Sequence, residues 1–159
     1  MANRVIVSAE ESLGELPWLE NAEKFVLDVL DRLEFDGEEI SVFFCQNEMI
    51  KELNKQYRDI DAPTDILSFE NGEEYTDEHG EKWISAGDMI ISLETLAENS
   101  AYFNVDENEE FKRLLIHGVL HLNGYDHGDE HIENGVVPTD PMIVLQESVL
   151  KDFSEITIK

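Results

Sequence analysis

Four of the five histidines of this chain lie between positions 117 and 131. His117 and His121 are four residues apart, so on a helix they project from one face, about 40° apart and one turn from each other. That spacing suits two imidazole ligands of one metal ion. His127 follows after Asn123-Gly124, a pair that ends helices, and a turn there would bring a third imidazole back over the last helical turn. The pattern predicts a metal site with His117, His121 and His127 as ligands.

Three neutral imidazoles leave the ion an open coordination position, as in catalytic zinc sites. Such an ion lowers the pKa of bound water to about 7 and polarises a carbonyl or phosphoryl oxygen. We expect one Zn²⁺ per chain, although a three-histidine site also accepts Ni²⁺ or another divalent metal. His131 lies among acidic residues and is interpreted as solvated, with a fourth or alternative ligand as the second reading. Gly118 occupies the position where a zinc peptidase carries its glutamate base, which disfavours proteolysis.

The segment that carries the first two histidines is predicted to be a buried central helix. Asp106 and Glu109 can form a variant capping box at its start, and Gly124 tolerates the positive φ that often follows a helix end. Between them the apolar residues cover nearly the whole circumference, which is typical of a core helix. Gly118, in the middle, suggests close approach of a backbone or a substrate. The metal site would therefore lie at the end of this helix.

The surrounding sequence predicts a single α+β domain over residues 1–159. Hydrophobic periodicity favours about four strands in a small mixed β-sheet and about five helices. The acidic stretch 70–81 is interpreted as a solvated hairpin loop, and 128–141 as a polar loop. The expected strands are 3–8, 40–45, 66–69 and 84–91, and the expected helices are 16–33, 47–57, 93–103, 106–124 and a last one from 142.

Composition limits the possible partners and compartment. Eleven basic against 37 acidic residues give a net charge of −26, which repels nucleic acid and anionic membranes unless basic residues are gathered locally. No apolar run reaches the roughly 18 residues of a membrane span. The N-terminus lacks the pattern of a secretory signal, and the one cysteine, Cys45, cannot form an internal disulfide. We therefore expect a cytoplasmic protein that does not bind membranes.

Three motifs resemble those of one family. The run His117-Gly-Val-Leu-His121-Leu-Asn-Gly-Tyr-Asp-His127 is similar to the signature of the YbeY family of bacterial endoribonucleases and rRNA maturation factors. The segment 53–69 resembles that family's Leu-Asn-x-x-Tyr-Arg and Asp-x-Pro-Thr-Asp-Val-Leu-Ser-Phe motifs, and Gly87-Asp-Met resembles its Gly-Asp-Ile strand.

The resemblance implies a metal-dependent endoribonuclease specific for single-stranded RNA. Such an enzyme acts in maturation of the 3′ end of small-subunit (16S) rRNA and in ribosome quality control. The implied zinc ligands are His117, His121 and His127, and Arg58 is the implied active-site arginine. The implied partners are single-stranded RNA, rRNA and the ribosome or its proteins, with no DNA.

Five of the eleven basic residues lie in or beside these motifs. Lys51, Lys55 and Arg58 share one helix face, and Lys112 and Arg113 come just before the first histidine. They can be ordinary solvated residues, but beside the histidines we interpret them as a local phosphate track. The planar fork of Arg58 can bind a phosphate bidentately and stabilise charge that develops during phosphoryl transfer.

Two other functions stay open at this point. The first is a metal-dependent hydrolase of another ester or of a peptide, which would act on a peptide library and not on RNA. The second is a ribosome assembly factor whose metal is structural, which would bind ribosomes without catalysing any reaction.

Overall fold

The structure is a computed structural model, and it describes residues 2–125 and 140–159. Its elements are β1 (Arg4–Ala9), a 3-10 helix (Glu11–Leu13), α1 (Leu19–Arg32), β2 (Glu38–Cys45), α2 (Asn47–Arg58), β3 (Ile66–Thr76), β4 (Lys82–Ser92), α3 (Leu93–Tyr102), α4 (Glu107–Leu122) and α5 (Pro141–Asp152). The described residues thus form four strands and five α-helices, which confirms the predicted α+β class.

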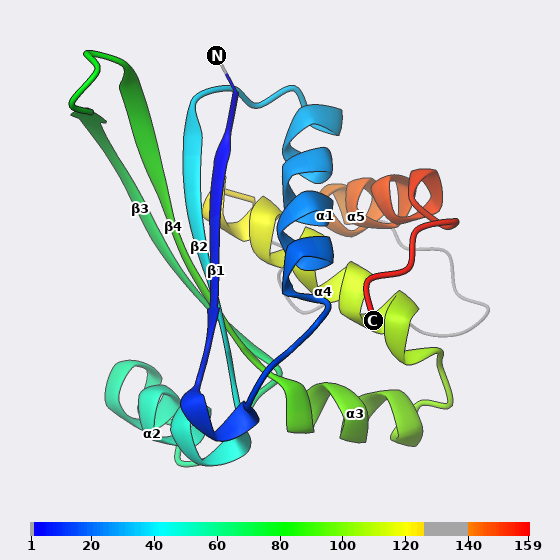
Figure 1. Cartoon of the computed structure of the whole chain (residues 1–159). Coiled ribbons are helices and arrows are strands. Elements are labelled where there is room, and N and C mark those ends of the chain that lie inside the picture. The colour runs from blue at the N-terminus through cyan, green and yellow to red at the C-terminus, as the bar shows by residue number, and fades with distance from the viewer. Residues whose placement is uncertain (1, 126–139) are drawn as a thin grey trace.

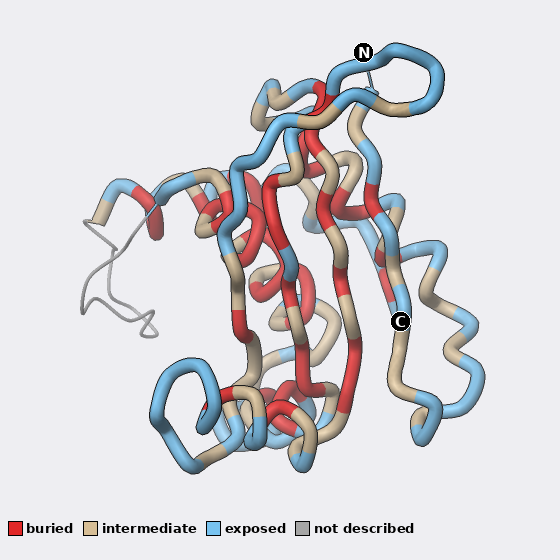
Figure 2. The backbone as a smooth tube through the Cα atoms, turned by 90° about the vertical axis from the view of Figure 1, so that its left-hand side faces the viewer, coloured by how far each residue is buried: buried red, intermediate tan, exposed pale blue. Residues whose placement is uncertain are grey.

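The four strands form one mixed sheet in the order β1-β2-β4-β3. Strands β1, β2 and β4 are parallel, and β3 is antiparallel to β4 at the edge. Helices α1, α4 and α5 lie on one side of the sheet, whereas α2 and α3 lie at one end of it (Figure 1). Residues alternate between buried and partly exposed along most of β2, because successive side chains point to opposite faces (Figure 2).

Helix α4 is the central helix of the core, as predicted. Phe111, Leu115 and Val119 are fully buried. Gly118 faces β4: a Cβ there would overlap the sulfur of Met89 and crowd Ile66. The sequence suggested that a backbone or a substrate lies close to Gly118. The structure instead places two side chains there, those of Met89 and Ile66. Among the described residues no helix combines the length and apolarity of a membrane span.

Both ends of α4 form as the sequence predicts. At the start, the carboxylate of Asp106 accepts a hydrogen bond from the Glu109 N–H at 3.0 Å. At the end, Gly124 has φ +87°, and its N–H donates to the His121 carbonyl at 3.1 Å. The N–H of Tyr125 donates to the Leu120 carbonyl at 3.1 Å, which completes a Schellman turn. This turn fixes the backbone next to the second histidine.

The acidic stretch 70–81 is a strand pair and not mainly a loop, so that prediction is wrong in its extent. β3 continues to Thr76 and β4 begins at Lys82, with a register shift between Glu70 and Glu73. The hairpin projects beyond the other strands (Figure 1). Tyr75 donates to Glu39 of β2 at 2.6 Å, and the Trp83 indole donates to Asp77 at 2.9 Å. These contacts hold the arm in strand conformation despite its charge.

Candidate active site

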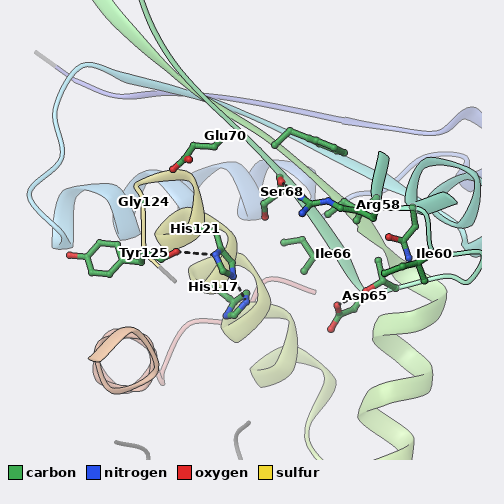
Figure 3. Close-up of a pocket in the computed structure, with 14 residues that line it drawn as sticks. Arg58, Ile60, Asp65, Ile66, Ser68, Glu70, His117, His121, Gly124 and Tyr125 are labelled. Carbon is green, nitrogen blue, oxygen red and sulfur yellow. Dashed lines mark hydrogen bonds between the residues drawn. The ribbon is translucent and has the colours of Figure 1, made fainter. Parts of the chain in front are cut away.

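An open cleft of about 780 Å³ lies beside the C-terminal end of α4. One wall is formed by the end of α4 with the turn that follows it, and the other by the end of α2 and the first residues of β3 (Figure 3). The cleft therefore brings together residues from two of the three motif segments, the one at 53–69 and the one that begins at His117. Among its lining residues are Arg58, Asp65, Ser68, Phe69, Glu70, His117, His121 and Tyr125.

The two helical histidines point toward each other. The Nε2 atoms of His117 and His121 are 2.9 Å apart, and the two rings stand almost perpendicular, at 81°. The helical spacing of four residues thus places both imidazoles at one point of the cleft wall. The sequence predicted this arrangement.

The opposite nitrogen of each ring contacts an oxygen acceptor. His117 Nδ1 lies 2.6 Å from Gln146 Oε1, and His121 Nδ1 lies 3.0 Å from the Tyr125 carbonyl. Because a carbonyl oxygen only accepts, each Nδ1 carries the proton and donates. We therefore assign an unprotonated Nε2, with its lone pair toward the other ring, to both histidines. Two such lone pairs repel one another unless a cation or a proton lies at that point.

This donor set fits a divalent metal ion such as zinc. Imidazole ligands of metals usually donate their other ring N–H to a carbonyl or carboxylate oxygen, as both histidines do here. No third His, Cys, Asp or Glu joins them within the described residues. His127, the predicted third ligand, and His131 both lie outside the described residues.

The orientation of the Gln146 amide is fixed by a network that extends away from the cleft. Its Nε2 donates to Glu147 at 3.1 Å, so its oxygen must face His117. Glu147 accepts two hydrogen bonds from Arg113, both at 3.0 Å, and Arg113 also donates to Glu110 at 3.0 Å. Gln146 is 2% exposed and has no spacing relation to the histidines in the sequence, so sequence reasoning missed it.

Arg58 lies across the cleft from the two histidines (Figure 3). It is the last residue of α2, and its Nη2 donates to the Ser68 carbonyl at 2.9 Å. Its guanidinium carbon lies 5.8 Å from the centre of the Phe69 ring. These contacts hold an exposed guanidinium at the rim of the cleft, and a guanidinium has further N–H donors for phosphate oxygens.

The other predicted phosphate-binding residues have different surroundings. Lys112 is 2% exposed, and its ammonium donates to the carbonyls of Phe153 and Ser154 at 2.9 and 3.4 Å. Its expected part in a phosphate track is wrong, because its charge is buried against the end of α5. Lys51 and Lys55 are exposed on α2, outside the cleft lining, and Lys51 lies 3.9 Å from Asp61.

Arg113 is also separated from the cleft. Burial opposes its charge, but the hydrogen bonds and charges of Glu147 and Glu110 raise the pKa of Arg113 above its ordinary value. Burial raises the pKa of Glu110, and the charge of Arg113 partly offsets that effect. The expected contact of Arg113 with substrate therefore has no support, since the guanidinium binds two carboxylates of its own chain.

Asp65 is a second residue of the cleft that the sequence did not single out. Burial raises the pKa of its carboxyl, while hydrogen bonds from the backbone N–H groups of Ile66 and Asp65 lower it. Its backbone carbonyl accepts a hydrogen bond from Ser92 at 3.0 Å, which fastens the start of β3 to the end of β4. The only sequence signal for Asp65 was its place in the Pro-Thr-Asp motif.

Comparisons with known proteins show which family the chain is similar to. A family model described as "Endoribonuclease YbeY" matches residues 8–153. The chain is 46% identical over 159 residues to a protein named Endoribonuclease YbeY from Treponema denticola, covering 99% of this chain and 98% of that protein. It is also 46% identical over 148 residues to the protein of that name from Treponema pallidum strain Nichols, covering 93% and 88%. The solution structure of a Thermotoga maritima protein matches with a TM-score of 0.61 and 27% identity, over 96% of this chain and 90% of that one.

Proposed function

The chain belongs to the YbeY family of endoribonucleases. From this premise we propose that it cleaves single-stranded RNA with the help of a divalent metal ion, which we expect to be zinc. The proposed ligands are His117, His121 and His127, and the proposed phosphate-binding residue is Arg58. An endoribonuclease acts on RNA as its substrate.

One observation carries the proposal: two imidazole nitrogens converge at 2.9 Å in a cleft that an arginine enters from the opposite wall. Both imidazoles have their other nitrogen held by a carbonyl oxygen. We interpret this as a metal-binding half-site beside a phosphate-binding group, a combination that can catalyse phosphodiester cleavage.

The two histidines, their hydrogen-bond acceptors and Arg58 then have defined parts. When bound, zinc supplies a Lewis acid for phosphoryl oxygens and lowers the pKa of water. Gln146 and the Tyr125 carbonyl keep a proton on Nδ1 of the two histidines, which leaves both Nε2 atoms available as ligands. Arg58 binds the phosphate and stabilises the negative charge that grows on its oxygens as the bond breaks.

The natural target that we propose is the 3′ end of small-subunit rRNA, presented in the cytoplasm by the ribosome or its proteins. The net charge of −26 supports presentation by a partner, because it repels RNA in solution outside the immediate surroundings of Arg58.

The test is cleavage of an end-labelled single-stranded RNA by the purified protein. We expect cleavage to stop after treatment with a chelator, to return on addition of about one equivalent of zinc, and to be absent in His117→Ala. His79→Ala is the matched control, because the His79 side chain is 78% exposed in the hairpin, away from the cleft lining. This variant should cleave as the wild type does.

Cleavage that persists after chelation and in His117→Ala would refute the metal-dependent site. No RNA cleavage by zinc-loaded protein, together with hydrolysis of a peptide library, would favour the alternative hydrolase. Ribosome binding without any RNA cleavage would favour an assembly factor with a structural metal.

A further inference from the structure

An exposed aromatic ring packs against a residue of the cleft wall, and it directly precedes Arg58 in the chain. Tyr57, in the last turn of α2, is 58% exposed, although large aromatic residues usually bury most of their surface. Its ring packs edge-on against Phe69 of β3, with 5.3 Å between the ring centres and 70° between the planes. Phe69 lines the cleft, so the Tyr57 ring lies one side chain away from the cleft lining.

The backbone around Tyr57 is held in place by hydrogen bonds. Asn54, one turn earlier and 5% exposed, donates its side-chain N–H to the Ala62 carbonyl at 2.9 Å. Its own carbonyl accepts from the Ile60 N–H at 3.3 Å. Asp59 takes the left-handed conformation, with φ +58°, and so reverses the chain directly after Arg58. The backbone that carries the ring is therefore held by a hydrogen-bonded turn.

An exposed ring carried by a fixed backbone near a cation has the properties of a nucleobase-binding surface. Proteins that bind single strands stack bases on aromatic side chains and place positive charge along the backbone, and this stacking tolerates any base. The Arg58 guanidinium carbon lies 5.8 Å from the centre of the Phe69 ring, so Arg58 and Tyr57 both lie against Phe69.

We propose that Tyr57, backed by Phe69, is a base-stacking subsite for the nucleotide next to the phosphate held by Arg58. The proposal rests on the proposed function, since it assigns a specificity residue to the same cleft. Only a base that is released from its own stack can lie on the ring, so the subsite selects single strands against duplexes. Tyr57 is thus a substrate-binding residue that does not take part in bond breaking.

The chain contains a matched control for an exposed aromatic pair. Tyr102 and Phe103 at the end of α3 are 83% and 60% exposed, and their rings also pack edge-on, with centres 5.0 Å apart. Whereas Tyr57 packs on Phe69 of the cleft wall, these two rings pack on each other, and neither residue lines the cleft. Tyr102→Ala therefore removes a ring that is even more exposed than Tyr57, but at a site where no base should stack.

The experiment measures binding of a short single-stranded RNA in which 2-aminopurine replaces one base at successive positions. Wild-type protein should quench the fluorescence strongly at one position, since stacking quenches this base. Tyr57→Ala should abolish that quenching and raise Kd about tenfold, the effect of losing one stacked base. Tyr57→Phe should restore both, and Tyr102→Ala should match the wild type. Thermal unfolding of all variants checks that each remains folded.

An abasic nucleotide at the quenched position provides the second half of the test. If the base stacks on Tyr57, wild type and Tyr57→Ala will bind the abasic RNA with the same Kd. Equal quenching in Tyr57→Ala and wild type, or an equal loss of affinity for intact and abasic RNA, would overturn the subsite.

Cleavage measured in parallel separates this proposal from the proposed function. Quenching that depends on Tyr57 in a protein that cleaves no RNA would leave the subsite standing and refute the nuclease function. Cleavage with unchanged KM and unchanged Kd in Tyr57→Ala would refute the subsite and leave the nuclease function standing. The expected change is a higher KM, with kcat much less affected.

Discussion

Two helices of this chain carry basic residues in or beside the sequence motifs, and both sets of residues were predicted to bind phosphate. The basic residues of one helix are exposed, whereas those of the other are paired inside the protein. On α2, Arg58 is exposed at the rim of the cleft, and Lys51 and Lys55 are exposed farther along the helix. On α4, Lys112 is buried against carbonyls at the end of α5, and Arg113 binds Glu110 and Glu147.

The difference comes from how much of each helix is covered. α4 crosses the core and contacts the sheet and three helices, so a cation in its middle must find a partner inside the protein. Lys112 finds the last carbonyls near the end of α5, where the helix dipole favours positive charge. α2 lies at the end of the sheet, with only Ile50 and Asn54 buried. A basic residue near a motif is therefore available to a ligand only where its helix has an open face.

The strongest way to break this comparison is to remove the arginine of α4. Arg113→Ala leaves Glu110 and Glu147 partly buried without a counter-ion, so we expect a loss of about 3 kcal/mol in the free energy of unfolding. The melting temperature should fall by roughly 6 to 12 °C. The salt dependence of RNA affinity should not change. A protein of normal stability with weakened salt dependence would place Arg113 on the RNA.

Replacing Gln146 tests whether α5 helps to bind the metal by orienting His117. Gln146→Leu removes the acceptor of His117 Nδ1 at 2.6 Å, and zinc affinity should fall about 10- to 100-fold. Competition with a coloured chelator measures this change. Gln56→Leu, an exposed position on α2, is the control and should bind zinc normally. Unchanged affinity in Gln146→Leu would show that the contact is not needed to orient the ligand.

Glu38 is a buried charge without the partners that Arg113 has. It is 7% exposed, and its Oε1 has no hydrogen-bond partner among the described residues. Burial raises the pKa of its carboxyl, although the Asn123 side chain partly offsets this. The folded protein thus holds this proton more tightly than the unfolded chain does. The stability that the group contributes is present below its unfolded pKa of about 4.3 and is lost as pH rises through the folded pKa.

Glu38→Gln has no carboxyl group at this position, so its stability should not fall as pH rises through the folded pKa of Glu38. The variant should be more stable than the wild type by about 1 kcal/mol at about pH 8, with no advantage near pH 4. Denaturant unfolding at both pH values measures the difference, with the exposed Glu20→Gln as control. Equal destabilisation at both pH values would instead mean that the charged carboxylate is favourable where it lies.

The smallest effects are expected for the exposed lysines of α2. Lys51→Gln and Lys55→Gln should each lower the slope of log Kd against log salt by about 0.7 if each contacts one RNA phosphate. Lys112→Met should leave the slope unchanged, because its ammonium is buried. An unchanged slope in all three variants would restrict the basic surface to Arg58.

Local patterns in the sequence predicted the parts of the site that depend on one helix. The four-residue spacing of His117 and His121, the Asp106 cap and the Gly124 turn all follow from backbone geometry within α4. Gln146 could not be predicted, because its contact with His117 depends on how α5 packs against α4 and on the Glu147 contact that orients its amide.

The surroundings of charged residues were likewise hidden from local patterns. Lys112 and Lys55 look alike in sequence, and only the packing of their helices separates a buried ammonium from an exposed one. The acidic composition of 70–81 predicts a loop, because glutamates disfavour strands, but pairing with β4 and the Tyr75–Glu39 contact outweigh that preference. Tertiary contacts decide both cases.

The central claim is that the cleft between α4 and the α2–β3 wall is where RNA is cut. Single-turnover cleavage by zinc-loaded Arg58→Ala tests it most directly, with Arg32→Ala, an exposed arginine paired only with Asp152 among the described residues, as control. We predict a rate about 10² to 10³ times lower in Arg58→Ala, with an unchanged melting temperature, and a normal rate in Arg32→Ala. Equal rates in Arg58→Ala and the wild type would place the chemistry elsewhere and contradict the account.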